Sequence, residues 1–169
     1  MKLLLVRHAI AEDAESFAVT GGTDALRPLT EVGRRKMRKG TNRLRTQVDH
    51  IDVLACSPRV RAHETAEIIA RAYGDLPLLE RPELDFTYPV EETALWLGQY
   101  RPEIVMAIVG HEPHLSLLSG LLLTAEPYPL IAFRKGGVAL LEFPGRAAPG
   151  EGILHWVLTP GQLRGLKQD

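Results

Sequence analysis

Continuous apolar runs, separated by longer mixed segments, are the clearest pattern in this 169-residue chain. The run at residues 2–6 and the run at 104–110 are apolar at nearly every position. Such runs are typical of strands that are covered on both faces of a sheet. Shorter runs of strand-forming residues predict four further strands, at 51–56, 76–80, 136–143 and 153–159.

Helical segments are predicted between most of these strands. Thr30 is a suitable N-cap for a helix over 31–47, and Ser57 followed by Pro58 predicts the start of a helix that Gly74 closes. Residues 9–29 have no sustained period and contain a Gly-Gly pair, which indicates a long loop, and 81–91 form a second one. Two further helices are expected at 91–100, before Pro102, and at 114–124, after Pro113.

Alternating strands and helices define the expected fold class. They predict an α/β protein with three layers, α/β/α, in which a mainly parallel central sheet is covered by helices on both faces. The last two strands, joined by a turn-rich segment, predict an antiparallel edge. No linker or repeat interrupts the pattern, so a single domain over residues 1–169 is expected.

Composition and charge narrow the classes of partner. A formal net charge of −1 provides no basic field for nucleic acid. The apolar segment from Leu115 is shorter than the ~20 residues that a membrane span needs, and too few apolar residues precede Arg7 for a secretory signal. Cys56, the only cysteine, is expected to be a core residue in a reducing compartment. A cytoplasmic protein without a nucleic-acid or membrane partner is therefore expected.

Arginine and histidine follow three of the predicted strands. Arg7 and His8 end the first run, Arg59 opens the helix after the second, and His111 precedes the helix after the strand at 104–110. Ligands of parallel sheets bind beyond the carboxyl ends of the strands, where these side chains would meet two helix N-termini. Because a guanidinium matches phosphate oxygens and stays charged, the predicted ligand is a phosphoryl group.

The same residues suit phosphoryl transfer. A neutral His8 could attack phosphorus if its other ring nitrogen donates to a carbonyl or carboxylate, and Arg7, Arg59 and a protonated His111 would hold the oxygens. This scheme requires neither a metal nor a cofactor. An unperturbed histidine protonates near pH 6 to 7, and His8 must be neutral to attack. We therefore expect kcat/KM to fall as the pH drops through that region.

Several motifs resemble those of a known family. Arg7-His8, the stretch "SPRVRAHETA" and "GHEP" resemble the histidine phosphatase superfamily, which has the phosphoglycerate mutase-like fold, while "RPLTEVG" and "KGGVALLEF" resemble its short SixA-type phosphohistidine phosphatase branch. The resemblance implies that His8 is transiently phosphorylated and that Arg7, Arg59 and His111 line the phosphate pocket. Asp24 and Arg27 match a pair near the mouth of the site in that branch, and Ser57 completes the predicted substrate-binding set.

One position departs from the family pattern. Ala9 stands where the superfamily usually has glycine. Since alanine at a positive φ would cost on the order of 1 kcal/mol, an ordinary backbone conformation is inferred at Ala9.

The general acid is less defined. Glu83 and Asp85 are candidates by superfamily position, and Glu12, Asp13 and Asp24 compete from the first loop. Phosphohistidine has a nitrogen leaving group that departs without strong acid assistance, and a chain of this length has few residues for a lid. The predicted substrate is therefore phosphohistidine on a signalling or phosphotransfer protein, such as a histidine phosphotransfer domain. The alternatives are a small phosphate ester and a non-catalytic phospho-binding module.

Two further interpretations remain open. A metallohydrolase would use His63, His111 and His114, although "HEPH" places a proline between two of them and lacks the i, i+4 spacing of a helical pair. The basic residues of the helix at 31–47 form either a solvated face or a docking surface for an acidic protein partner.

Overall fold

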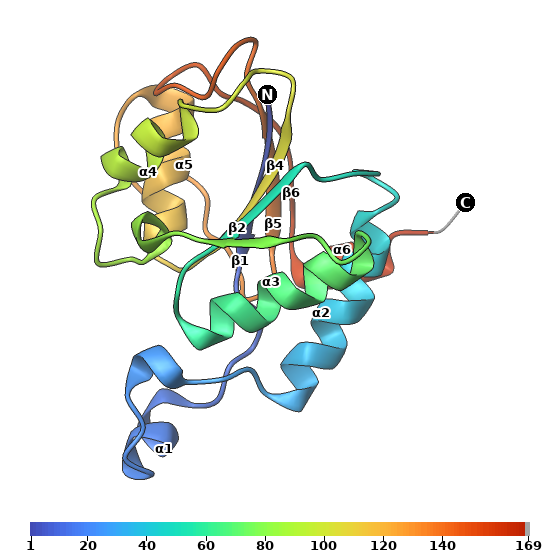
Figure 1. Ribbon diagram of the computed structural model, residues 1–169, viewed down its shortest axis with the longest axis vertical. Helices are drawn as coiled ribbons and strands as arrows, with labels where there is room; N and C mark the ends of the chain where they lie inside the picture. Colours follow the sequence, from blue (N-terminus) through green and yellow to red (C-terminus); the bar gives the residue numbers. More distant parts are fainter. Residues whose placement is uncertain (168–169) are drawn as a thin grey trace.

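A single six-stranded sheet forms the centre of the computed structural model, which describes residues 1–167 (Figure 1). Residues 168 and 169, the end of the predicted domain, lie outside the described part. The strand order is β3-β2-β4-β1-β5-β6. Strands β3, β2, β4 and β1 are parallel to one another, whereas β5 pairs antiparallel with both β1 and β6. The mainly parallel sheet with an antiparallel edge is confirmed, with strands β1 (Lys2–Arg7), β2 (Val53–Cys56), β3 (Leu78–Glu80), β4 (Val105–Gly110), β5 (Val138–Glu142) and β6 (Ile153–Leu158).

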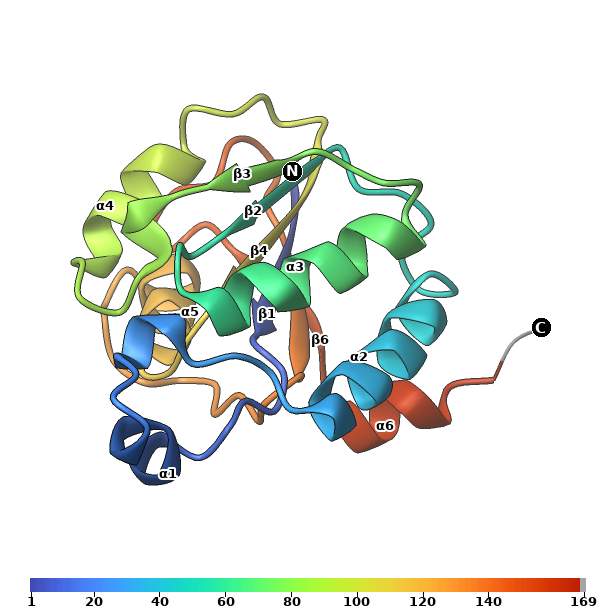
Figure 2. The same ribbon diagram turned by 60° about the horizontal axis from the view of Figure 1, so that its bottom comes forward.

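Helices cover both faces of this sheet (Figure 2). One face carries α2 (Glu31–Leu44), α3 (Val60–Ala72) and α6 (Pro160–Gly165), and the other carries α4 (Val90–Leu97) and α5 (His114–Thr124). Successive residues of β1 point to opposite faces, so Leu4 and Val6 join one core cluster while Leu3 and Leu5 join the other. The continuous apolar run at 2–6 therefore reflects burial on both sides, and the three-layer α/β/α class is confirmed.

Three elements differ from the sequence-based expectation. Helix α3 begins at Val60 with Arg59 as its N-cap, so Ser57 and Pro58 precede the helix instead of starting it. The predicted loop at 9–29 contains the helix α1 (Ala14–Val19), none of whose residues is buried and which therefore has no hydrophobic period. Helix α6 was not predicted, although Thr159 and Gln162 form a capping box at its start.

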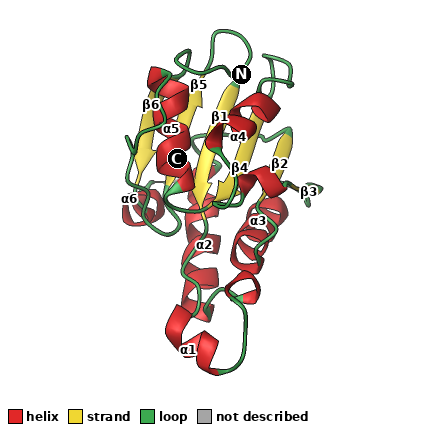
Figure 3. Cartoon of the chain, turned by 90° about the vertical axis from the view of Figure 1, so that its left-hand side faces the viewer, coloured by secondary structure: helices red, strands yellow, loops and turns green. Residues whose placement is uncertain are grey.

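The segment after β1 carries α1 beyond the carboxyl end of the sheet and returns to α2 (Figure 3). It is fixed close to the sheet, because the Thr30 N–H donates to the Ile10 carbonyl over 2.9 Å and Ala11 forms a β-bridge with Leu29. Gly33 packs so closely on this segment that a Cβ there would lie 2.1 Å from the Ile10 oxygen. The start of α2 thus holds the backbone that follows His8.

No helix within residues 1–167 is long and apolar enough to cross a membrane.

Candidate active site

A pocket of about 440 Å³ lies at the carboxyl end of the parallel strands. It is formed by residues that follow β1 and β4, by α3 and by the loop that contains the short 3₁₀ helix Asp24–Leu26. This is the topological position that the sequence predicts for ligand binding. The polar lining includes Arg7, His8, Asp24, Arg27, Arg61 and His111.

His8 is held in one orientation by the backbone. Its side chain is buried, and Nδ1 lies 2.7 Å from the Ala9 carbonyl oxygen. Since a carbonyl can only accept, Nδ1 carries the proton and Nε2 keeps its lone pair. The backbone of Ala9 is fixed in turn by the Thr65 hydroxyl, which accepts its N–H over 3.0 Å. Ala9 is not among the positive-φ residues of the described chain, as inferred from the sequence.

Both histidines of the pocket are neutral in the free protein. Burial is the main cause that lowers the pKa of His8 to about 3, and the charges of Arg61 and Arg7 act in the same direction. Burial lowers the pKa of His111 to about 2, assisted by His8 and Arg61. The expectations of a His8 that titrates near pH 6 to 7 and of a protonated His111 are therefore corrected. His8 should remain competent to attack well below pH 6.

Three buried nitrogen atoms in the pocket lining have no hydrogen-bond partner within residues 1–167. They are Nε of Arg7, Nε of Arg61 and Nδ1 of His111, and only Thr41 elsewhere has a similar buried side-chain atom in that range. Their residues are otherwise anchored: Arg7 donates to the Phe133 carbonyl over 2.6 Å, and Nε2 of His111 lies 2.8 Å from the Ser57 hydroxyl. A buried donor without an acceptor costs about 1–3 kcal/mol. An oxyanion bound here would relieve this cost.

Arg61, and not the predicted Arg59, lies in the pocket. Arg61 is only 3% exposed. Its Nη1 donates to the Asp24 carbonyl over 2.7 Å, and its Nη2 donates to the Asp24 carboxylate over 3.0 Å. Sequence reasoning missed it because the helix was expected to start two residues earlier. Thr65, four residues further along α3, was an available signal, since its hydroxyl donates to the Arg61 carbonyl over 2.7 Å.

Arg59 does not line the catalytic pocket and donates to two carboxylates, of which Asp24 lines the pocket and Asp85 does not. It donates to Asp85 through Nε and Nη2, over 2.6 and 3.2 Å, and to Asp24 through Nη1, over 2.7 Å. Its guanidinium lies 4.1 Å from the ring centre of Phe86, which lines the pocket and meets His111 edge-on. Arg59 therefore supports the wall of the pocket, and the structure does not bring it to the position predicted for it.

Asp24 and Arg27 do meet at the pocket, as predicted. The Asp24 carboxylate accepts from Arg27 over 2.9 Å and also from Arg59 and Arg61. Burial alone would raise the pKa of Asp24, but Arg27 and Arg61 lower it overall. Asp24 thus joins three arginines as a carboxylate. The third predicted binding residue, Ser57, contacts His111 and does not line the pocket.

The two candidate acids lie outside the pocket. Glu83 pairs with Arg81 over 2.6 Å. Asp85 accepts from Arg59 and from Thr87; burial would raise its pKa, but these hydrogen bonds lower it overall. Neither carboxyl group reaches the pocket in which a leaving group would be protonated. The carboxylates that do line the pocket are Glu12, Asp13, Asp24 and Glu112.

The three histidines of the metal alternative do not form a common site. His63 lies 3.7 Å from Glu67 and from Glu80, whereas Nε2 of His114 lies 2.9 Å from the Thr93 hydroxyl. His111 contacts Ser57. Within the described residues, no group of three or more His, Cys, Asp or Glu side chains could hold a metal ion.

Comparison with known proteins agrees with this geometry. Residues 3–85 match the model of the histidine phosphatase superfamily, branch 1. An uncharacterized protein of Picosynechococcus sp. is 32% identical over 123 residues, which cover 68% of each chain. The structure of the protein histidine phosphatase SixA complexed with tungstate superposes with a TM-score of 0.81 and 26% identity, covering 96% of this chain and 99% of that one.

A putative phosphohistidine phosphatase SixA from Nakamurella multipartitia is similar as well, with a TM-score of 0.73 and 25% identity over 94% of this chain and 95% of that one. Fold and site together define a phosphatase with the phosphoglycerate mutase-like fold. The chain belongs to the histidine phosphatase superfamily, and within it to the SixA-type branch.

Proposed function

We propose that this protein hydrolyses phosphohistidine on a signalling or phosphotransfer protein, such as a histidine phosphotransfer domain, through a phospho-His8 intermediate. The observation that carries the proposal is the arrangement around His8. Its Nε2 is left unprotonated by the hydrogen bond from Nδ1 to Ala9, in a pocket where Arg7, Arg61 and His111 each have a buried nitrogen without a partner within residues 1–167. The nucleophile and the groups that hold the phosphoryl oxygens thus share one site.

In the proposed mechanism, Nε2 of His8 attacks phosphorus and forms a new P–N bond as the P–N bond of the substrate breaks. The imidazole of the substrate takes a proton from solvent water and leaves as the neutral base. Arg7 and Arg61 hold the phosphoryl oxygens through both steps. We assign the His111 proton to Nδ1, which has no partner within residues 1–167, so that Nε2 accepts from the Ser57 hydroxyl over 2.8 Å. The Ser57 oxygen also accepts the backbone N–H of Arg59 over 3.4 Å. Water then cleaves the phospho-His8 bond. These residues supply the positive charge, so the proposed reaction needs no metal ion.

Most carboxylates near the pocket are already engaged by hydrogen bonds, which favours phosphohistidine over a phosphate ester as the substrate. Of the four that line it, Glu112 accepts from Ser116 and from the Phe133 N–H, and Glu12 is the one left as a candidate acid. An alkoxide leaving group has to be protonated, usually by a carboxylic acid near the pocket. The hydrogen bonds from Ser16 lower the pKa of Asp13, and arginines lower that of Asp24. Glu83 and Asp85 bind arginines elsewhere. An imidazole leaving group places no such demand on the site.

The test compares turnover of a phosphohistidine-bearing phosphocarrier protein with a panel of small phosphate esters, using His8→Ala as the blank. We expect higher kcat/KM on the phosphoprotein, an acid-labile and alkali-stable phosphate on His8 in quenched reactions, and a loss of about 10³-fold or more in His8→Ala. Activity should also survive chelation.

Turnover by His8→Ala would overturn the mechanism. A preference for an ester would instead assign the pocket to a small phosphorylated metabolite, the second candidate function. Binding of the phosphoprotein without turnover would indicate a phospho-binding module.

A further inference from the structure

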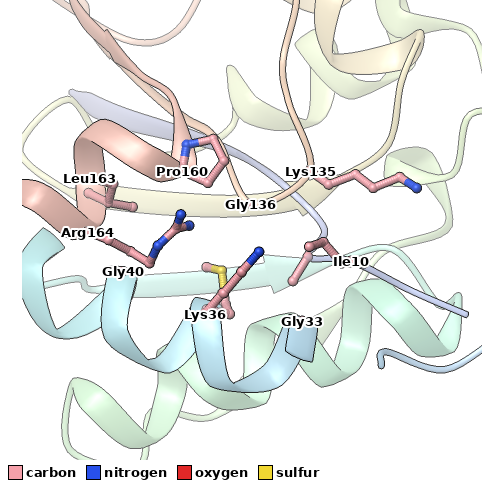
Figure 4. Close-up of a pocket in the computed structure, with 11 residues that line it drawn as sticks. Ile10, Gly33, Lys36, Gly40, Lys135, Gly136, Pro160, Leu163 and Arg164 are labelled. Atoms are coloured by element: carbon pink, nitrogen blue, oxygen red, sulfur yellow. The ribbon is translucent and has the colours of Figure 1, made fainter. Parts of the chain in front are cut away.

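A second, smaller pocket lies beside the catalytic one, where α2 and α6 approach the segment after His8 (Figure 4). Its volume is about 100 Å³. Ala9 and Ile10, which directly follow the nucleophile, form one side, and Lys135 lines both this pocket and the catalytic pocket. The two pockets are therefore neighbours that share Lys135 in their linings.

The floor of the second pocket is apolar and built by close packing. Met37 and Leu163 are buried beneath it and join the core cluster on this face of the sheet. Gly136 has no side chain to fill it; a Cβ there would lie 3.7 Å from the Cβ of Pro160 and 3.8 Å from the sulfur of Met37. The depression is thus a fixed feature of the junction between α2, α6 and the turn before β5.

The rim of the second pocket carries only positive charge. Lys36 of α2 and Arg164 of α6 extend from neighbouring helices toward the opening, and Lys135 extends past Ile10 (Figure 4). Among residues 1–167, no carboxylate lines it. Within residues 1–167, none of the three forms an ion pair, whereas other basic residues of α2 do: Arg34 pairs with Glu64, and Arg38 with Glu31.

Such a rim attracts an acidic group of small size. The volume accommodates one side chain, whose methylene groups would contact Met37 and Leu163 while its carboxylate meets the cations. A phosphohistidine in the catalytic pocket is carried by a protein, so neighbouring side chains of that protein must lie over the adjoining surface. Complementary charge at this place would favour encounter and fix the register of the substrate.

We propose that the second pocket binds an aspartate or glutamate side chain of the phosphorylated protein substrate. This inference rests on the proposed function, and it assigns to Lys36 and Arg164 the recognition of the acidic protein partner that the basic helix at 31–47 suggested.

The first experiment measures binding without any phosphoryl chemistry. A short Glu-rich peptide and its Gln counterpart are titrated into the isotopically labelled protein. We expect amide shifts at Lys36, Gly136 and Arg164 with the Glu peptide only. Binding should be about tenfold weaker in the double variant Lys36→Glu/Arg164→Glu. The double variant Arg45→Glu/Arg101→Glu, which changes the net charge equally at two exposed residues outside both pockets, serves as the control.

The second experiment compares kcat/KM on the phosphoprotein and on 4-nitrophenyl phosphate. Lys36→Glu/Arg164→Glu should lose about tenfold on the phosphoprotein and retain activity on the ester, and the control variant should lose neither. Equal losses in both variants, or peptide shifts elsewhere on the surface, would overturn the proposal. If the wild type does not hydrolyse the phosphoprotein, the proposed function fails, and the peptide titration still decides whether the pocket binds acidic side chains.

Discussion

Arg59 and Arg61 are two residues apart, yet the fold gives them different surroundings. All three nitrogens of Arg59 donate to Asp85 or Asp24. Arg61 is nearly fully buried, lines the catalytic pocket and keeps Nε unpaired within residues 1–167. Arg61 lines the pocket together with His8, and its Nε–H, unpaired within that range, can bind a phosphoryl oxygen. Arg59 does not line the pocket and uses three of its five N–H donors on carboxylates. Arg61 is therefore the better candidate for transition-state stabilisation.

This difference predicts unequal effects of substitution. Arg61→Ala should lower kcat/KM by about 10²- to 10³-fold and should also weaken the binding of a non-reacting oxyanion, because it removes a group that holds the phosphoryl oxygens. Arg59→Ala should lower kcat/KM by less than about tenfold, because it acts through the pocket wall. It should cost more in the free energy of unfolding, because it leaves the buried Asp85 without its partner. Steady-state kinetics and urea denaturation of both variants measure this, and a larger catalytic loss in Arg59→Ala would contradict the assignment.

The residues of the site were predictable to the extent that strands position them. Arg7, His8 and His111 directly follow strands whose apolar runs are unambiguous, so their convergence follows from a parallel sheet. The choice between Arg59 and Arg61 depends on where α3 begins, and "SPRVRA" contains a proline that suggested an earlier start. Glu83 and Asp85 form ion pairs with Arg81 and Arg59 in the folded protein. The spacing of these residues in the sequence does not indicate either pair.

At the scale of elements, the hydrophobic pattern predicts the strands and helices that are buried and misses those that are short or exposed. The run at 104–110 predicts β4 because every residue of that strand is buried. Helix α1 was missed because none of its residues is buried, and α6 because its six residues include Pro160 and two glycines. Both contact functional surfaces: α1 begins at the rim of the catalytic pocket, and α6 forms one side of the second pocket.

The junction between α2 and the segment after His8 depends on one glycine. A Cβ at Gly33 would lie 2.1 Å from the Ile10 oxygen, which is backbone and cannot rotate away. Gly33→Ala should therefore push α2 from this segment and destabilise the protein by about 1–3 kcal/mol, despite the gain in helix propensity. It should also lower kcat/KM, since the Ala9 carbonyl that orients His8 precedes Ile10.

The matched control for this substitution is Gly165→Ala, at a helical glycine whose added Cβ would meet no atom within 4 Å. Urea denaturation and kinetics of both variants provide the measurement. If Gly33→Ala unfolds at the same denaturant concentration as Gly165→Ala, the contact between Gly33 and Ile10 does not constrain the segment that follows His8.

For the whole molecule, a catalytic centre built from buried neutral histidines makes stability depend on pH. Burial lowers the pKa of His8 to about 3 and that of His111 to about 2, and it also lowers the pKa of His114. In the unfolded chain these groups protonate near pH 6.5. Below that pH the unfolded state binds protons that the folded state does not, so the stability present above pH 6.5 is lost as the pH falls toward 3.

The expected slope is about 1.4 kcal/mol per pH unit for each such histidine. The lowered pKa values of Asp24 and Asp85 act from about pH 5 downward, where unfolded aspartate (pKa about 3.9) begins to protonate, so the histidines make the larger contribution between pH 6 and 4.5. Urea denaturation across this range should show a smaller slope for His111→Gln than for the wild type. Equal slopes in the two proteins would mean that the pocket histidines are not held neutral by burial, and the lowered pKa of His8 would fail with them.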